Sequence, residues 1–139
     1  MAARITQQFP DIPFAELSPG SRFHAELHLT EELVREYIRL AGVRTRQPQD
    51  TVPPSLYCTF LPMFQAMGGR MEQGTLQVGQ RIRVRRAVTV GTVLAAEVTV
   101  REAVEVHGRR QVVVETVFSD RDVVTCVSTS TYFWGYARR

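Results

Sequence analysis

The chain has 139 residues, of which 44% are hydrophobic, so it can form one domain whose core needs neither a metal ion nor a disulfide. No apolar run approaches the roughly 18 residues of a membrane-spanning helix, so we predict no contact with a membrane. The net charge is +3 and all 17 basic residues are arginine, which excludes a lysine Schiff base, and the dispersed charges argue against nucleic-acid binding.

The first 20 residues are rich in proline and predict an irregular arm. Because residues 1–13 carry charges and no apolar segment of a secretory signal, we expect a cytoplasmic protein. Apolar and polar residues then alternate from Arg22 to Leu29, which predicts a strand with one buried face.

A helix is predicted directly after this strand. Thr30 is a suitable N-cap, and Glu31 and Glu32 follow in the first turn, where the helix dipole favours negative charge. Apolar residues recur at helical spacing over the next turns, and Gly42 ends the helix. Residues 43–52 are polar and predict a loop.

Residues 53–67 form the most apolar stretch of the chain. Prolines stand near its start and a pair of glycines follows its end, an arrangement typical of a helix. Because apolar residues occur on all sides, we predict a helix that is buried all round. Pro62 lies inside this helix and predicts a kink or a split into two pieces.

From Leu76 onward the pattern changes to strands. Runs rich in valine and other strand formers cover residues 93–106, 111–118 and 123–134, and short turns separate them. Short turns between long strands predict an antiparallel meander. A curved antiparallel sheet around an apolar helix is the hot-dog architecture, so we predict an α+β fold and a single hot-dog domain over residues 1–139.

Two segments carry a resemblance to a known family. The sequence AVTVGTVL, residues 87–94, resembles the recurring turn into a long strand of the MaoC-like (R)-specific enoyl-thioester hydratases and dehydratases. The sequence TEELVREYIRLAG, residues 30–42, is similar to the helix that precedes the catalytic loop of that family. The resemblance covers residues 20–134. It implies an acyl thioester of coenzyme A or acyl carrier protein as ligand, and a homodimer or a heterodimer with a second hot-dog subunit.

The chain departs from the catalytic signature of this family. Family hydratases follow the helix with glycine-aspartate-x-asparagine-proline-x-histidine, because the reaction needs a positioned acid/base pair. Here Val43 stands at the aspartate and Pro48 at the histidine, and neither side chain can transfer a proton. Asp50 matches a later family aspartate. The sequence VPPS, residues 52–55, resembles the non-catalytic halves of double hot-dog dehydratases.

The candidate site residues lie on or near the apolar segment. We predict Asp50 and Tyr57 as catalytic groups, since a carboxylate can transfer a proton and a phenol can donate to a substrate carbonyl. The predicted substrate-binding residues are Arg44, Ser55, Cys58 and Gln65. The competing interpretations are a solvated loop for the residues before the segment, a core tyrosine with a satisfied hydroxyl, and buried thiols for Cys58 and Cys126.

Other polar residues have two interpretations each. His24 is the nearest spare base if its strand borders the pocket, although a surface histidine is the simpler interpretation. Arg81, Arg83, Arg85 and Arg86 form a basic stripe that can dock coenzyme A phosphates or an acidic carrier protein, or simply cover the solvent face of a sheet.

Several functions remain open at the level of the sequence. The first is a hydratase/dehydratase-like lyase with a non-standard site. The alternatives are a non-catalytic partner subunit of a heteromeric dehydratase, a cyclase or other tailoring enzyme on a polyketide-like substrate, and a thioesterase. The thioesterase is disfavoured because residues 54–67 contain no acid. The sequence indicates no metal and no redox cofactor.

Overall fold

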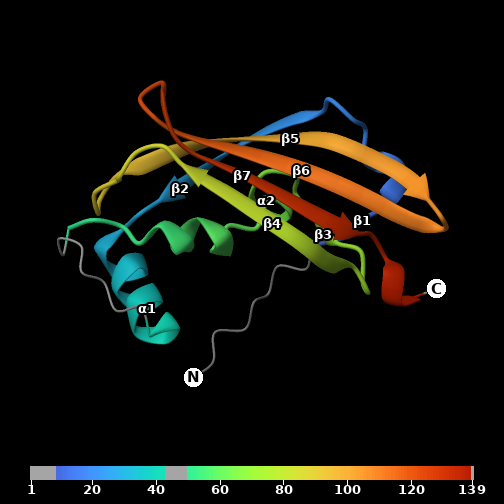
Figure 1. Ribbon diagram of the computed structural model, residues 1–139, viewed down its shortest axis with the longest axis horizontal. Helices are drawn as coiled ribbons and strands as arrows, with labels where there is room; N and C mark the ends of the chain where they lie inside the picture. Colours follow the sequence, from blue (N-terminus) through green and yellow to red (C-terminus); the bar gives the residue numbers. More distant parts are fainter. Residues whose placement is uncertain (1–8, 43–49, 139) are drawn as a thin grey trace.

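Five strands form one antiparallel sheet in the computed structural model, which describes residues 9–42 and 50–138. Their spatial order is β2 (Arg22–His28), β5 (Val93–Val106), β6 (Arg109–Asp120), β7 (Val123–Phe133) and β4 (Leu76–Val84). The sheet arches over the helical segments between β2 and β4, and Figure 1 shows helix α1 (Glu31–Ala41) at one end of the arch. The predicted meander and the α+β class are confirmed.

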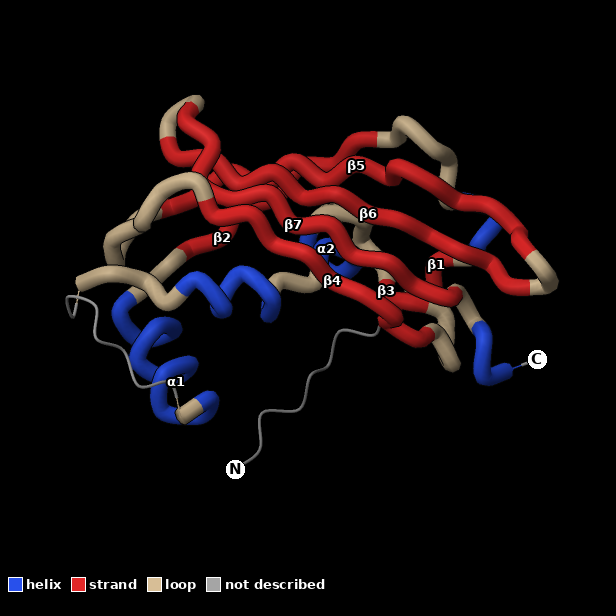
Figure 2. Tube along the Cα trace, in the orientation of Figure 1, coloured by secondary structure: helices blue, strands red, loops and turns tan. Residues whose placement is uncertain are grey.

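Two tight turns join the three central strands. The β5–β6 turn places His107 and Gly108 at φ 49° and 73°, and the β6–β7 turn places Arg121 and Asp122 at φ 48° and 67°. Two-residue turns with positive φ match the right-handed twist of the strands they connect. Figure 2 shows the long twisted strands that result.

The N-terminal arm is more ordered than its prolines predict. Strand β1 (Asp11–Ile12) pairs in parallel with β3 (Arg70–Met71), and a single-turn helix, η1 (Phe14–Glu16), follows. Arg70 forms an ion pair with Asp11, and the Trp134 indole N–H donates to the Ile12 carbonyl at 2.9 Å. These contacts join distant parts of the chain, so local sequence patterns do not predict them.

Helix α1 has the predicted caps. The Thr30 hydroxyl accepts a hydrogen bond from the Leu33 N–H at 3.1 Å, and Gly42 ends the helix at φ 62°. Val34 is its only buried residue, whereas Leu40 is 70% exposed. The helix therefore packs through a narrow stripe at the end of the sheet.

The apolar segment is split at Pro62, as predicted, into the 3-10 helix η2 (Pro54–Thr59) and the short helix α2 (Pro62–Gln65). The prediction that this segment is buried on every side is wrong. Ser55, Cys58, Leu61 and Gln65 are exposed. The sheet covers one side of the segment only, so each short helix buries the residues that face the sheet and leaves the others in solvent.

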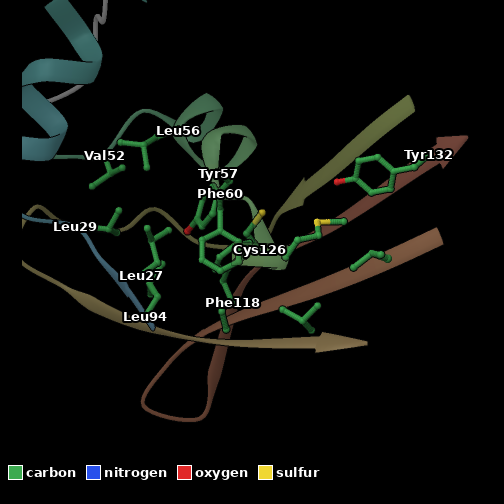
Figure 3. Packing of buried hydrophobic residues seen from close by; sticks show 14 of the residues in the cluster. Leu27, Leu29, Val52, Leu56, Tyr57, Phe60, Leu94, Phe118, Cys126 and Tyr132 are labelled. Atoms are coloured by element: carbon green, nitrogen blue, oxygen red, sulfur yellow. The ribbon is translucent and has the colours of Figure 1, made fainter. Parts of the chain in front are cut away.

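The core lies between this segment and the inner face of the sheet. The rings of Tyr57 and Phe60 pack against Phe118 of β6, with centroids 4.9 and 5.3 Å away. Figure 3 shows these rings beside Cys126 of β7, which is fully buried. No helix within residues 9–42 and 50–138 is both long and apolar enough to cross a membrane.

Candidate acyl-binding cavity

A small apolar cavity of about 120 Å³ lies where the central segment begins beside the end of β4. Its lining comes from residues 50–53, which form a strap before η2, from η2 itself, and from β4 with the residues that follow it. The lining residues are Thr51, Val52, Pro54, Tyr57, Val84, Arg86, Ala87 and Val88. Two segments that are far apart in the sequence, residues 51–57 and 84–88, therefore meet to form one pocket.

Backbone hydrogen bonds fix the two walls of this cavity. The Val52 N–H donates to the Val88 carbonyl at 2.8 Å, and the Val90 N–H donates to the Asp50 carbonyl at 2.7 Å. Thr51 and Thr89 form an antiparallel bridge between these bonds. The segment that resembles the family turn, residues 87–94, thus holds the strap that leads into the central segment.

Tyr57 contributes its ring to the cavity wall. Its side chain is 3% exposed, and its hydroxyl lies 3.0 Å from the Thr125 hydroxyl. Because the Thr125 hydroxyl donates its own proton to the Phe118 carbonyl at 3.3 Å, Tyr57 is the donor toward Thr125. Burial raises the pKa of Tyr57, so the phenol is neutral at physiological pH. Its hydroxyl is satisfied inside the protein.

The lining residues are mostly apolar, and one of them is charged. Among the described lining residues there is no carboxylate and no imidazole, and Arg86 is the charged member. Such a wall can hold an acyl chain and can donate hydrogen bonds, but it lacks a group that exchanges protons near neutral pH. Within residues 9–42 and 50–138, no group of three or more His, Cys, Asp or Glu side chains could hold a metal ion.

The other predicted site residues are spread around the segment. Asp50 is exposed beside the strap, and Gln65 is exposed at the far end of α2. Ser55 is exposed and accepts a hydrogen bond from the Tyr37 hydroxyl at 2.6 Å. Arg44, together with the residues aligned to the family's acid/base pair at positions 43–48, lies outside the described residues.

Cys58 is exposed, so the competing interpretation of this residue as a buried thiol is wrong, whereas Cys126 is buried as that interpretation expects. Cys58 follows Tyr57 on η2. Partial burial still raises the pKa of the Cys58 thiol, which disfavours the nucleophilic thiolate. His24 lies on the outer face of the sheet, opposite Glu97, and does not border the cavity.

A buried polar strip on the inner face was missed by the sequence patterns. Thr116 faces Ser128 across β6 and β7, and both are less than 7% exposed. Gln80 of β4 donates weakly to Ser128 at 3.4 Å, and a hydrogen bond links Tyr132 to Ser130. The available signal was the run STST at residues 128–131, which puts hydroxyls on both faces of the last strand.

The five-stranded antiparallel sheet that arches over the helical segments makes this protein a hot-dog domain. A hot-dog-like protein from Thermanaerovibrio acidaminovorans has a similar structure, with a TM-score of 0.63, 15% identity, and coverage of 88% of this chain and 87% of that chain. No family model matches the sequence, and no curated protein matches it.

The solved structures similar to this chain include dehydratases and (R)-hydratases. The HadBC complex (3R-hydroxyacyl-ACP dehydratase) from Mycobacterium tuberculosis contains a chain with a TM-score of 0.67 and 16% identity, with coverage of 82% of this chain and 95% of that chain. The R-hydratase PhaJ1 from Pseudomonas aeruginosa gives a TM-score of 0.64 and 19% identity, with coverage of 92% and 88%. At these identities the likeness establishes the fold.

Proposed function

We propose that this chain is a MaoC-like hot-dog protein that binds an acyl thioester of coenzyme A or acyl carrier protein. The observation that carries the proposal is the apolar cavity at the start of the central segment. Its position between η2 and the end of β4 suits an acyl chain that enters from the edge of the sheet. The neighbours named as (R)-hydratases and dehydratases support this ligand class.

The activity that we propose is that of a hydratase/dehydratase-like lyase with a non-standard site. A specific observation also favours the alternative of a partner subunit that binds acyl chains without catalysis. The described cavity lining contains no carboxylate and no imidazole, so a second hot-dog subunit would supply the acid/base pair. HadBC is itself named as a complex, which is consistent with this alternative.

We also propose that β4 is the edge where two hot-dog subunits pair. Leu76, Val78 and Val84 on this edge strand are 43%, 47% and 42% exposed. An edge strand with exposed apolar side chains and unpaired backbone groups favours pairing with another strand. Such pairing would continue the sheet and would place the cavity, which Val84 lines, close to the subunit boundary.

Acyl binding is testable with butyryl-CoA and a matched pair of substitutions. Isothermal titration calorimetry should show saturable binding to the wild-type protein. Ala87→Leu adds volume to the cavity wall and is expected to weaken binding about tenfold, since one or two methylenes of misfit cost about 1–3 kcal/mol. Ala95→Leu, an exposed alanine on β5 outside the cavity, should leave the affinity unchanged. Absence of binding to the wild type would refute the proposal.

Catalysis is tested separately with crotonyl-CoA, by following the enoyl absorbance. If the purified protein turns over crotonyl-CoA, and the rate falls in Tyr57→Phe or Asp50→Asn, the substituted side chain takes part in the reaction. Turnover that neither substitution alters removes both from the proposed site. If butyryl-CoA binds but crotonyl-CoA turns over only after a second hot-dog subunit is added, the partner-subunit alternative is correct.

A further inference from the structure

A polar groove of about 530 Å³ lies on the outer face of the sheet, across β4, β7 and β6. The strand register places its side chains: Gly79 faces Thr131, Arg81 faces Thr129, and Arg83 faces Val127. The complete lining is Gly79, Gln80, Arg81, Arg83, Glu115, Val127, Thr129 and Thr131. Ile82 and Cys126 alternate with the arginines and with Val127 along their strands, so they point to the inner face. The Gln80 side chain also turns to the inner face, where it donates to Ser128. The side of the sheet that carries Arg81 and Arg83 is therefore opposite to the acyl cavity.

The groove carries uncompensated positive charge. Arg81 and Arg83 have no ion pair within the described part of the chain. Glu115 is the one acid in the lining, and Arg101 of β5 neutralises it through a 2.6 Å ion pair. Two guanidinium groups therefore dominate the local field. Their Cα positions are two residues apart on one strand, about 7 Å by strand geometry.

Gly79 keeps the end of the groove open. A Cβ atom built at Gly79 would meet nothing within 4 Å, and its φ lies outside the left-handed region that favours glycine. Neither packing nor backbone conformation therefore requires glycine here, although glycine weakens a strand. The missing side chain instead leaves free space beside Arg81, on the same face of β4.

We propose that this groove is a binding site for a small free ligand that carries a diphosphate group, such as a nucleoside diphosphate. Each guanidinium can bind a phosphate through two parallel N–H···O bonds, and the paired arginines match two linked phosphates. The hydroxyls of Thr129 and Thr131 supply further donors. The volume is that of a small-ligand pocket, and the lining has no aromatic side chain on which nucleic-acid bases could stack.

The experiment is a calorimetric titration of the full chain with inorganic diphosphate and with ADP at low salt. Saturable 1:1 binding to the wild type is expected, and it should weaken as salt is raised. The double variant Arg81→Gln/Arg83→Gln should lose at least about tenfold in affinity, because it removes charge-assisted hydrogen bonds. Gly79→Val fills the groove with a residue suited to a strand, so it should also abolish binding while the circular dichroism spectrum and melting temperature are retained.

The matched control is the double variant Arg35→Gln/Arg121→Gln, which lowers the net charge equally at exposed sites outside the groove. This control should bind diphosphate as the wild type does. The proposal is overturned if the wild type shows no saturable binding at millimolar diphosphate, or if the control loses as much affinity as the groove variants.

Butyryl-CoA distinguishes this site from the acyl cavity. Ala87→Leu should weaken butyryl-CoA binding and leave diphosphate binding intact, whereas Gly79→Val should do the reverse. If Gly79→Val weakens butyryl-CoA as strongly as it weakens diphosphate, the groove holds the nucleotide end of coenzyme A, and a separate free ligand is ruled out. Failure of acyl binding alone would leave the diphosphate result unaffected.

Discussion

Cys126 and Tyr132 extend from β7 into the core, and both are almost completely removed from solvent. Figure 3 shows Cys126 beside the aromatic rings, with the Tyr132 hydroxyl directed toward the interior. Burial raises the pKa of Cys126 to about 11, from a usual value of 9.0, and also raises the pKa of Tyr132. The folded state therefore holds Cys126 as a neutral thiol, so ionisation of this thiol favours unfolding.

This linkage predicts a loss of stability at alkaline pH. Below about pH 9 the Cys126 thiol is protonated in the folded and the unfolded state, so its contribution to the stability of the fold is fully present. Between about pH 9 and 11 the thiol ionises in the unfolded state but stays protonated in the folded state, and this contribution is lost. The free energy of unfolding should fall by roughly 2 kcal/mol over this interval through Cys126 alone. Urea unfolding at pH 8 and pH 11, under reducing conditions, measures it.

The control for this prediction compares two cysteine variants. Cys126→Ala should show a smaller alkaline loss than the wild type, even though its stability at pH 8 is lower because of the cavity. Cys58→Ala removes an exposed thiol that raises the pKa of Cys126 less than burial does, so it should keep most of the wild-type pH dependence. An alkaline loss that is identical in wild type and Cys126→Ala would contradict the linkage.

At the scale of elements, the parallel pair β1–β3 fastens the N-terminal arm to the end of the sheet. Gly69 precedes β3, and a Cβ at this position would collide with the Ile12 side chain and approach the Pro10 carbonyl to 3.0 Å. The pair therefore depends on a residue without a side chain, at a place where two backbones come close.

Gly69→Ala should consequently destabilise the protein by about 1–3 kcal/mol, the usual range for overpacking. Thermal or urea unfolding measures the change. Gly79→Ala is the matched control, because a Cβ there meets nothing within 4 Å and should leave stability unchanged or slightly raised. Equal effects of the two substitutions would show that close packing at β1–β3 does not limit stability.

Elements with a strong local signal are predictable from this sequence, and elements made by distant contacts are not. Thr30 and Gly42 bound α1 because capping depends on a few neighbouring residues, and the valine-rich runs give β5, β6 and β7 almost to their ends. The pair β1–β3 has two residues on each side, too short for any periodic pattern. The exposed side of the central segment also escapes prediction, since composition records apolar residues but not which of them the sheet covers.

The candidate site is less predictable than the fold for a similar reason. Tyr57 was found because it is the polar aromatic residue on an apolar segment, and it does line the cavity. Arg86 and Ala87 lie on the opposite wall, thirty residues later, and only the pairing of the strap with residues 88–90 brings them there. The roles proposed for Asp50, Ser55, Cys58 and Gln65 remain predictions that the substrate experiments above can test.

At the scale of the whole molecule, the exposed β4 edge predicts a dimer. Analytical ultracentrifugation at micromolar concentration should give about twice the chain mass. Val78→Lys places a charge on this edge, where the register with β7 is interrupted, and should convert the dimer to a monomer with an unchanged circular dichroism spectrum.

Val123→Lys is the control for this edge. Val123 is 39% exposed, close to the 47% of Val78, but it lies at the β6–β7 hairpin away from β4. The control should remain a dimer. A wild-type monomer, or dissociation by both variants alike, would contradict pairing through β4.

The strand order also orders the steps by which the chain folds. Strands β5, β6 and β7 are joined by two-residue turns, so their pairing closes very small loops, whereas β2 reaches β5 and β4 reaches β7 only after long intervening stretches of chain. Closing long loops costs more entropy and slows folding. The central meander is therefore expected to form first and to protect its amide hydrogens longest from exchange. Both outer strands should dock last, and β4 should stay the most open to exchange until a second subunit covers it.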